Sequence, residues 1–417
     1  MVITAPTARS DATVSVNVGG TAGADSNTIV YSSTGTVTTN VVANDADINI
    51  IAPNSVRLLD SGGNRVTSLT VAGGTFTVSG NSIVFDPDGT VVGTIAAQYN
   101  YLDALTGNQA LSATGTLTIT TTNSAPTVAD DLTNTPNNTP RVVAASANDT
   151  DPNGNASVTG AIDLDPTDAD IDDTAIVTGG TFTTVGQPAG SVLFTPVDAT
   201  FTGIATVSYN IRDAFGLVST NSATISVNVG PQAVKDDVTA SYTATVSTNV
   251  TTNDLDVHGI STAAGSLQLV DPVTGLPTTA TSVTITGQGT FTVNSPSNGF
   301  ITFTPLAGAN FIGTASVRYV VLDNNGTNRA LSSQGTYSVT TTNTAPVANA
   351  DAANPLGGFT STTINVVAND TDVNGFATIN AGSVRFPGGA TSVAVTGGTF
   401  TVNTSTGVVT FTHHAGV

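Results

Sequence analysis

A short acidic motif occurs four times in the chain and sets its organisation. The motif is Asn-Asp-x-Asp, and its copies begin at Asn44, Asn148, Asn253 and Asn369, which places them 104, 105 and 116 residues apart. A period of this size is typical of a tandem array of domains, since solenoid repeats are only about 20–50 residues long. The 417 residues therefore predict four copies of one domain-sized unit.

Other short sequences recur with the same period. Each repeat border carries a proline, each repeat carries a Gly-Thr-Phe-Thr stretch, and the first three carry a tyrosine followed four residues later by an aspartate. The prolines are Pro6, Pro126, Pro231 and Pro346, and the Gly-Thr-Phe-Thr stretches begin at Gly74, Gly180, Gly289 and Gly398. The tyrosines are Tyr99, Tyr209 and Tyr319. We therefore expect repeats at 1–123, 124–230, 231–343 and 344–417, the last of them incomplete because it lacks the tyrosine segment.

Two repeats depart from the common pattern. The first has an apparent insertion at about 17–35, between Asp11 and the strand expected before Asn44. The second has an acidic insertion at 163–173, which contains Asp163, Asp165, Asp168, Asp170, Asp172 and Asp173. Six like charges so close together repel one another unless water or a cation neutralises them. This segment is therefore either a solvated loop or a local calcium site.

The composition predicts an all-β fold. All 29 acidic residues are Asp, so Glu is missing, and Lys235 is the one lysine. Strong helix formers are thus scarce, whereas β-branched residues dominate the short alternating segments. Each complete repeat has about seven such segments, with turn residues every 8–12 positions, as an immunoglobulin-like sandwich requires. In this alternation we expect Phe76, Phe85 and Tyr99 to face the core.

Charge and motifs exclude several classes of function. The net charge of −20 argues against binding to nucleic acid or to anionic lipid. No run of 18 apolar residues exists, so we expect no direct insertion into a membrane. The chain lacks cysteine, its three histidines do not recur between repeats, and no glycine-rich phosphate loop precedes a helix. We therefore expect no enzymatic activity.

The recurring acids are candidate calcium ligands. Calcium prefers carboxylate, amide and carbonyl oxygens, and loops at one end of a sandwich bring the motif and the aspartate after the tyrosine close together. The candidates are Asn44, Asp45, Asp47 and Asp103; Asn148, Asp149, Asp151 and Asp213; Asn253, Asp254, Asp256 and Asp323; and Asn369, Asp370 and Asp372. Asn and Asp also recur wherever their side chains close turns on the backbone, so turn formation without metal remains the alternative.

The ordered motifs resemble the tandem cadherin-like, fibril-type repeats of large bacterial surface adhesins. The best match is Val366-Val367-Ala368-Asn369-Asp370-Thr371-Asp372, with Asn374-Gly375 after it. The resemblance implies secretion, display on the cell surface and calcium-dependent rigidity. It also implies that the sandwiches follow one another in an elongated rod. The missing Glu leaves a cadherin-style linker site incomplete.

Together these features predict a structural stalk segment of a secreted cell-surface adhesin or filament, which projects a distal binding region. Its expected partners are the neighbouring repeats of the parent chain. Two alternatives stand beside the stalk. The repeats themselves bind carbohydrate or a protein, or the chain is a filament subunit that self-associates. In the last case a strand donated by a neighbouring molecule completes the fourth repeat; otherwise a longer parent chain continues it.

Overall fold

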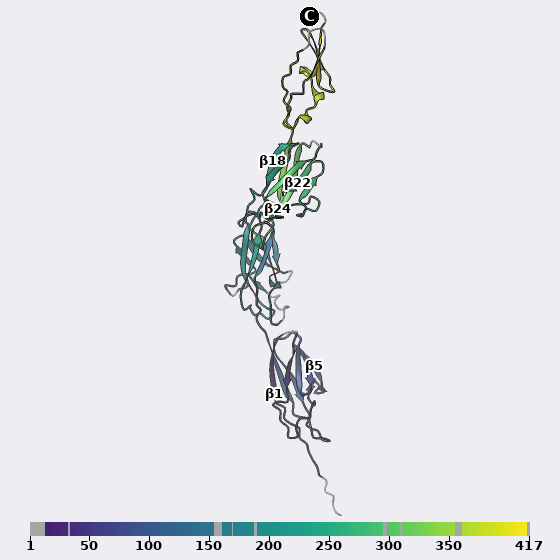
Figure 1. Cartoon of the computed structure of the whole chain (residues 1–417). Coiled ribbons are helices and arrows are strands. Elements are labelled where there is room, and N and C mark those ends of the chain that lie inside the picture. The colour runs from purple at the N-terminus through teal and green to yellow at the C-terminus, as the bar shows by residue number, and fades with distance from the viewer. Residues whose placement is uncertain are drawn as a thin grey trace, which may run out of the picture. The chain divides into compact units, whose positions relative to one another are not determined.

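The computed structural model describes residues 13–31, 34–153, 161–168, 170–186, 190–294, 298–308, 311–354 and 361–414. The described residues form β-strands in seven sheets (Figure 1), as the composition predicts. Short 3-10 helices lie between some strands: η1 (Ala145–Ala147), η3 (Phe376–Thr378), η4 (Ala381–Ser383) and η5 (Pro387–Gly389). In the described part of the chain, no helix has the length and apolar character needed to cross a membrane.

The first repeat is a sandwich of two sheets. One contains, in spatial order, β1 (Ala24–Val30), β9 (Gly115–Thr122), β8 (Gly93–Asn100), β3 (Arg57–Leu59) and β4 (Arg65–Val66). The other contains β2 (Val37–Asn40), β7 (Ser82–Pro87), β6 (Gly74–Ser79) and β5 (Ser68–Val71). β1 runs parallel to β9, whereas the other neighbouring strands of the two sheets pair antiparallel.

The second and third repeats have the same strand order. The sheets of the second are β10 (Asp131–Thr135), β17 (Ala223–Val229), β16 (Gly203–Ile211) and β12 (Ile162–Asp163), and β11 (Arg141–Val143), β15 (Ser191–Pro196), β14 (Gly180–Val185) and β13 (Thr174–Val177). Those of the third are β18 (Asp236–Ser241), β25 (Gly335–Thr342), β24 (Gly313–Val321) and β20 (Leu267–Leu269), and β19 (Val246–Asn249), β23 (Phe300–Pro305), β22 (Gly289–Val293) and β21 (Ser282–Ile285). The chain is therefore all-β, with tandem immunoglobulin-like, cadherin-like sandwiches, as predicted.

Contacts between residues group the chain into two compact units. One comprises Met1–Asp131, Val142–Phe194 and Thr206–Ser226, and the other comprises Leu132–Arg141, Thr195–Ala205 and Val227–Val417. The division falls within the second repeat and not at a repeat border. The four repeat boundaries given above therefore remain a prediction from sequence.

Aromatic side chains fill each core from the expected positions. Phe76 and Phe85, on paired strands of one sheet, have ring centroids 4.6 Å apart, and both are fully buried with Tyr99 from the opposite sheet. The Cβ of an alanine at Gly115 would lie 2.5 Å from Cζ of Tyr99. The ring therefore packs directly on the backbone of β9. The prediction that these three aromatic residues face inward is confirmed.

The structure corrects the interpretation of 17–35 in the first repeat. The described part of this segment contains β1, which pairs in parallel with β9 as β18 pairs with β25 in the third repeat. Its Asp25 bonds to the hydroxyl of Tyr99, as Asp236 bonds to that of Tyr319. The segment is thus the first strand of the sandwich and not an insertion. Pro6 and Asp11, from which the insertion was counted, lie outside the described residues.

The fourth repeat has one sheet among its described residues, as its missing tyrosine segment predicts. This sheet contains β26 (Thr362–Asn365), β29 (Val408–His413), β28 (Gly398–Val402) and β27 (Ser392–Val395). Phe400 and Phe411 stack at 4.6 Å like the phenylalanine pairs of the other repeats. However, both are only partly buried, whereas Phe291 and Phe303 of the third repeat are fully buried. In the third repeat, the second sheet therefore completes the burial of Phe291 and Phe303.

Candidate metal sites

The asparagine of each motif is a structural residue. In all four repeats its side-chain amide donates to a backbone carbonyl of the segment that enters the repeat. The acceptors are Ala24 O for Asn44 at 2.9 Å, Asp130 O for Asn148 at 3.0 Å, Lys235 O for Asn253 at 3.1 Å and Ala350 O for Asn369 at 3.0 Å. Since the same bond forms in every repeat, the amide fixes the motif against the incoming chain and needs no metal to do so.

The first aspartate of each motif has the complementary role. Its Oδ1 accepts a backbone N–H of the same incoming segment in every repeat. The pairs are Gly23 and Asp45 at 2.5 Å, Ala129 and Asp149 at 2.9 Å, Val234 and Asp254 at 2.7 Å, and Asn349 and Asp370 at 2.7 Å. Together, the Asn-Asp pair clamps the start of the repeat through one donor and one acceptor. For these residues the interpretation as backbone hydrogen-bonding groups is favoured over that as calcium ligands.

The first aspartate also lies at the tyrosine hydroxyl with a second carboxylate. In the third repeat the hydroxyl of Tyr319 lies 2.9 Å from Asp236 Oδ2 and 3.1 Å from Asp254 Oδ1. The carbonyl oxygens of Val234 and Val250 are each 2.9 Å from it. A phenol has one proton to donate, so these four oxygens compete for it, and protonation of a carboxyl group would relieve that competition.

Burial favours the protonated form of these carboxyl groups. It raises the pKa of Asp254 to about 6, and hydrogen bonds from the Val234 amide and Tyr319 offset only part of the rise. Burial likewise raises the pKa of Asp131 in the second repeat to about 6, with the charge of Asp149 adding to it. In the first repeat burial raises the pKa of Asp25, although the bond from Tyr99 opposes it. Each complete repeat thus contains a tyrosine–carboxyl cluster, made of one tyrosine and two aspartates whose pKa is raised by burial.

The second aspartate of each motif faces a different environment. In the first, second and fourth repeats its Oδ1 accepts the backbone N–H of an asparagine two residues later: Asn49 for Asp47 at 2.8 Å, Asn153 for Asp151 at 2.6 Å and Asn374 for Asp372 at 2.7 Å. Among the described residues, Oδ2 of Asp47 and Oδ2 of Asp151 are buried without a hydrogen-bond partner. These two oxygens are the free acceptors that an oxygen-preferring cation needs.

The aspartate after the tyrosine is held by hydrogen bonds in all three complete repeats. Its Oδ2 accepts an asparagine amide from the segment that leads into the sandwich: Asn17 for Asp103, Asn123 for Asp213 at 2.6 Å and Asn228 for Asp323 at 2.5 Å. Burial by itself raises the pKa of Asp103, but the bonds from Asn17 and the backbone amides of Ala110 and Leu105 outweigh burial and lower it. The carboxylate of Asp103 is therefore ionised in the folded protein.

The structure divides the aspartates that were predicted to form one calcium site per repeat into two groups. Asp45, Asp149 and Asp254 lie at the tyrosine hydroxyls, so they belong to the tyrosine–carboxyl clusters. Asp47 and Asp103 are both bonded to Asn49, through its backbone and its side chain respectively. In the third repeat one donor atom each from Asp256, His258 and Asp323 lie within 4.8 Å of one another. The possible cation positions are therefore at the second aspartate and the post-tyrosine aspartate.

Sequence reasoning did not assign the asparagines of these sites. Asn153 donates to the carbonyls of Tyr31 and Thr122 and accepts the Ser124 amide at 2.7 Å. Asn374 makes the equivalent bonds to Ser241 Oγ at 2.5 Å and from the Thr344 amide at 2.8 Å. We call these two residues the junction asparagines, because each bonds to the end of the preceding repeat. The Asp-x-Asn spacing, which also occurs at Asn49, is the signal that identifies them.

The acidic segment of the second repeat is shaped by its own turns. Asp163, only 1% exposed in β12, accepts the backbone N–H groups of Asp165 at 3.0 Å and Asp172 at 3.3 Å. Carboxylate oxygens of Asp165, Asp168 and Asp172 lie within 4.8 Å of one another. Burial and the charge of Asp168 raise the pKa of Asp172. A calcium ion in this segment remains a prediction.

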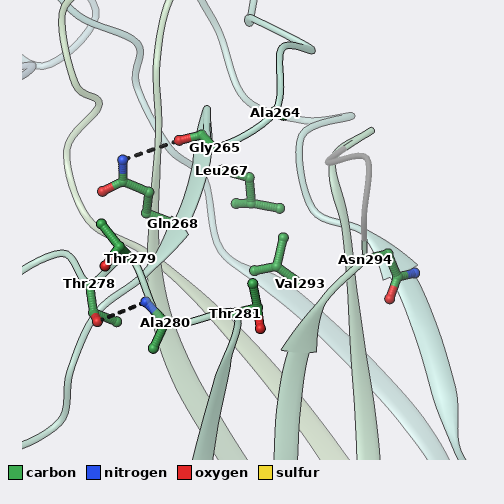
Figure 2. Close-up of a pocket in the computed structure, with 10 residues that line it drawn as sticks. All are labelled: Ala264, Gly265, Leu267, Gln268, Thr278, Thr279, Ala280, Thr281, Val293 and Asn294. Carbon is green, nitrogen blue, oxygen red and sulfur yellow. Dashed lines mark hydrogen bonds between the residues drawn. The ribbon is translucent and has the colours of Figure 1, made fainter.

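A small hollow in the third repeat lacks the charged side chains of the candidate metal sites. It measures about 160 Å³ and is lined in part by Leu267, Gln268, Thr278 and Val293 (Figure 2). Pockets for small ligands are typically about 300–1,000 Å³. The lining includes neither an aromatic ring nor a charged side chain. It therefore offers no platform for a sugar and no acid or base.

Comparison with solved structures finds tandem extracellular domains. The EC21–23 segment of human CDH23 is 13% identical, with 75% of this chain and 97% of that chain covered and a TM-score of 0.24. Mouse cadherin-23 EC22–24 (13%, 77% and 96%, 0.23) and Drosophila N-cadherin EC1–4 (13%, 94% and 92%, 0.21) are similar to the same degree. We assign no family or function from this similarity. No protein-family model and no curated protein matches the chain.

Proposed function

We propose that the chain is a structural stalk segment of a large secreted, cell-surface adhesin of bacterial type. The observation that carries the proposal is the recurrence of hydrogen bonds across repeat borders. Asn228, on the last strand of the second repeat, bonds to Asp323 of the third, and Asn153 bonds to Tyr31 and Thr122 of the first. Side chains at the borders thus couple neighbouring repeats, as the transmission of force along a stalk requires. The proposal includes no catalytic activity.

The distribution of aromatic residues supports the stalk over a carbohydrate-binding module. Sugar-binding faces use exposed aromatic rings, and this chain has no tryptophan. All seven tyrosines are buried: Tyr31, Tyr99, Tyr101, Tyr209, Tyr242, Tyr319 and Tyr337. The tyrosines thus contribute to the cores and to the tyrosine–carboxyl clusters, and none offers an exposed ring to a sugar.

Calcium is proposed as a structural ion at the first two repeats. The free, buried Oδ2 atoms of Asp47 and Asp151 fit an oxygen-liganded cation, and we propose Asp103 and Asp213, the post-tyrosine aspartates of the same repeats, as further ligands. A bound ion supplies positive charge that links the motif loop to the post-tyrosine loop. These protein groups position the loops through hydrogen bonds whether or not the ion is present.

Small-angle scattering of the full chain, in millimolar calcium and in chelator, tests both parts of the proposal. A stalk predicts an elongated particle in calcium, and a calcium requirement predicts a smaller maximum dimension in chelator. The Asp151→Asn variant should lose part of this response. A compact particle in both solutions contradicts the stalk, whereas an elongated particle in both contradicts only the structural role of calcium.

The fourth repeat favours strand donation as a second candidate function. In its described residues Phe400 and Phe411 are only half covered, and the strand β27 beside them is exposed throughout. A strand or sheet from another molecule would complete their burial. Sedimentation at increasing concentration distinguishes the candidates, since a filament subunit forms growing assemblies and a stalk segment remains monomeric.

A further inference from the structure

The third repeat differs from the others at one residue of its border. Where the first, second and fourth repeats have Asn49, Asn153 and Asn374, two residues after the second aspartate, the third has His258. The substitution replaces an amide with an imidazole, whose nitrogen is a good ligand for transition metals. The rest of the site is retained, because Asp256 and Asp323 occupy the positions of Asp151 and Asp213.

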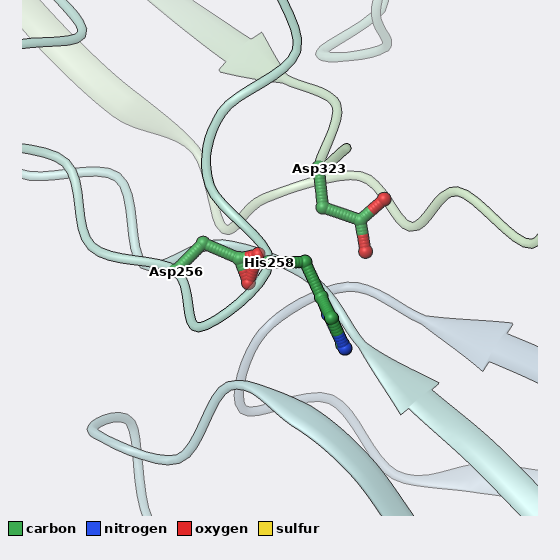
Figure 3. Close-up of side chains that lie close together, drawn as sticks. All are labelled: Asp256, His258 and Asp323. Atoms are coloured by element: carbon green, nitrogen blue, oxygen red, sulfur yellow. The ribbon is translucent and has the colours of Figure 1, made fainter. Parts of the chain in front are cut away.

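The change leaves three donor groups together. One donor atom each from Asp256, His258 and Asp323 lie within 4.8 Å of one another, and Figure 3 shows the two carboxylates on either side of His258. Over the described ranges, neither carboxylate oxygen of Asp256 has a hydrogen-bond partner, and both oxygens are buried. Nδ1 of His258 is also buried and unpartnered there. Buried polar atoms left unsatisfied on neighbouring residues are costly unless a ligand satisfies them.

The equivalent aspartates each have at least one oxygen with a hydrogen-bond donor. Asp151 has one oxygen bonded to the Asn153 amide at 2.6 Å, and Asp372 has one bonded to the Asn374 amide at 2.7 Å. The junction asparagines also use their side chains for bonds to the preceding repeat, so they are not available as ligands. Asp256 and His258 therefore form a binding arrangement that the other repeats lack.

Asp323 is already oriented for binding. Its Oδ1 accepts the backbone amides of Asn325 at 3.3 Å and Ala330 at 3.1 Å, and its Oδ2 accepts the Asn228 amide at 2.5 Å. The side chain is fully buried. Carboxylates that ligate metals are commonly held by such outer hydrogen bonds, which set their direction. The ligand is thus preorganised before an ion arrives.

We propose that Asp256, His258 and Asp323 form a site for a divalent transition cation of the zinc class. One imidazole and two carboxylates match the nitrogen and oxygen donors that zinc takes at about 2.0–2.2 Å, with water completing the tetrahedron. Calcium, in contrast, takes six to eight oxygens and gains little from imidazole. The inference deepens the proposed coupling of repeats at one border. It does not rest on calcium binding at the first two.

Titration of the full chain with Zn²⁺ by calorimetry tests the site. The other two histidines, His413 and His414, are first replaced by asparagine to remove adventitious binding. In this background we expect one zinc ion per chain. His258→Asn, which installs the residue of the other repeats, should weaken zinc binding by at least about 10–100-fold, the loss that even outer-shell partners cause. Asp256→Asn should weaken it similarly, and the thermal unfolding of each metal-free variant checks that it folds.

A matched control is Asp151→Asn, which alters the same position of the second repeat and should leave zinc affinity unchanged. Co²⁺ in place of zinc should give the visible absorption of a four-coordinate ion in the background protein, and this absorption should be lost in His258→Asn.

Equal zinc affinity of His258→Asn and the background protein would overturn the proposal, as would loss of binding in Asp151→Asn. If scattering shows no calcium response while zinc binding depends on His258, the calcium proposal fails and this one stands.

Discussion

The hydroxyl of Tyr319, on β24, lies 3.1 Å from Oδ1 of Asp254, in the loop after β19, although the two residues are 65 positions apart. The same relationship joins Tyr99 to Asp45 at 3.2 Å and Tyr209 to Asp149 at 3.0 Å. In each complete repeat this contact connects the core to the Asn-Asp motif, which clamps the incoming chain. The tyrosine is therefore a central polar group of the sandwich.

Tyr319→Phe should destabilise the third repeat. It removes the hydroxyl that lies among Asp236, Asp254 and two carbonyls, and a buried acceptor left unpaired costs about 1–3 kcal/mol. Tyr337→Phe is the control, because that hydroxyl contacts Thr248 Oγ1 at 2.9 Å and should cost only about 0.5–1.5 kcal/mol. Native-state hydrogen exchange of β24 in the full chain measures both changes. Equal effects would contradict the central role of Tyr319.

Stability should increase as the pH falls from 7 toward 4. The pKa of Asp131 and of Asp254 is raised to about 6 in the folded protein, against about 3.9 in an unfolded chain. The folded state therefore binds these protons more tightly, so the stabilisation is complete below about pH 4 and is lost as the pH rises through about 6. The lowered pKa of Asp103 has the opposite effect, which sets in only at more acidic pH.

Thermal unfolding in chelator at pH 5 and pH 7 measures this dependence. In the variant that combines Asp131→Asn and Asp254→Asn, the amide imitates a protonated carboxyl group. The difference in melting temperature between the two pH values should therefore shrink. An unchanged difference would show that the pH dependence arises elsewhere.

Gly335→Ala should destabilise the third repeat. An alanine Cβ there would lie 2.5 Å from Cζ of the buried Tyr319 ring, and overpacking of this kind costs about 1–3 kcal/mol. Gly186→Ala is the control, since its Cβ would meet nothing within 4 Å, and we expect it to be neutral or slightly stabilising. Denaturant unfolding of the full chain compares them, and a neutral Gly335→Ala would contradict the close packing.

Phe291→Ala should cost about 3–5 kcal/mol, because the ring is fully buried against Phe303 and Tyr337. Phe400→Ala, at the same position of the fourth repeat, should cost less, because that ring is already partly exposed. Hydrogen exchange of β22 and β28 measures the two losses separately. An equal loss would show that the ring of Phe400 is covered in solution, as strand donation requires.

Much of the fold could be predicted from local pattern. The alternation within Gly-Thr-Phe-Thr places Phe76 inward, and the Asn-Asp pair recurs because each repeat needs the same clamp. The strand within 17–35 could not be predicted, because the parallel pairing of β1 with β9 joins residues about 90 positions apart. Such pairing leaves no local signal.

The sequence by itself determined the repeat period, the strands and the buried aromatic residues, since these depend on side-chain periodicity and on composition. Only the tertiary structure decided what the acids do. Asp254 and Asp256 are two residues apart, yet one lies at the hydroxyl of Tyr319 and the other beside His258 and Asp323. The loops of a sandwich bring distant residues together, so the packing of the sheets sets the partners, burial and protonation of each carboxylate.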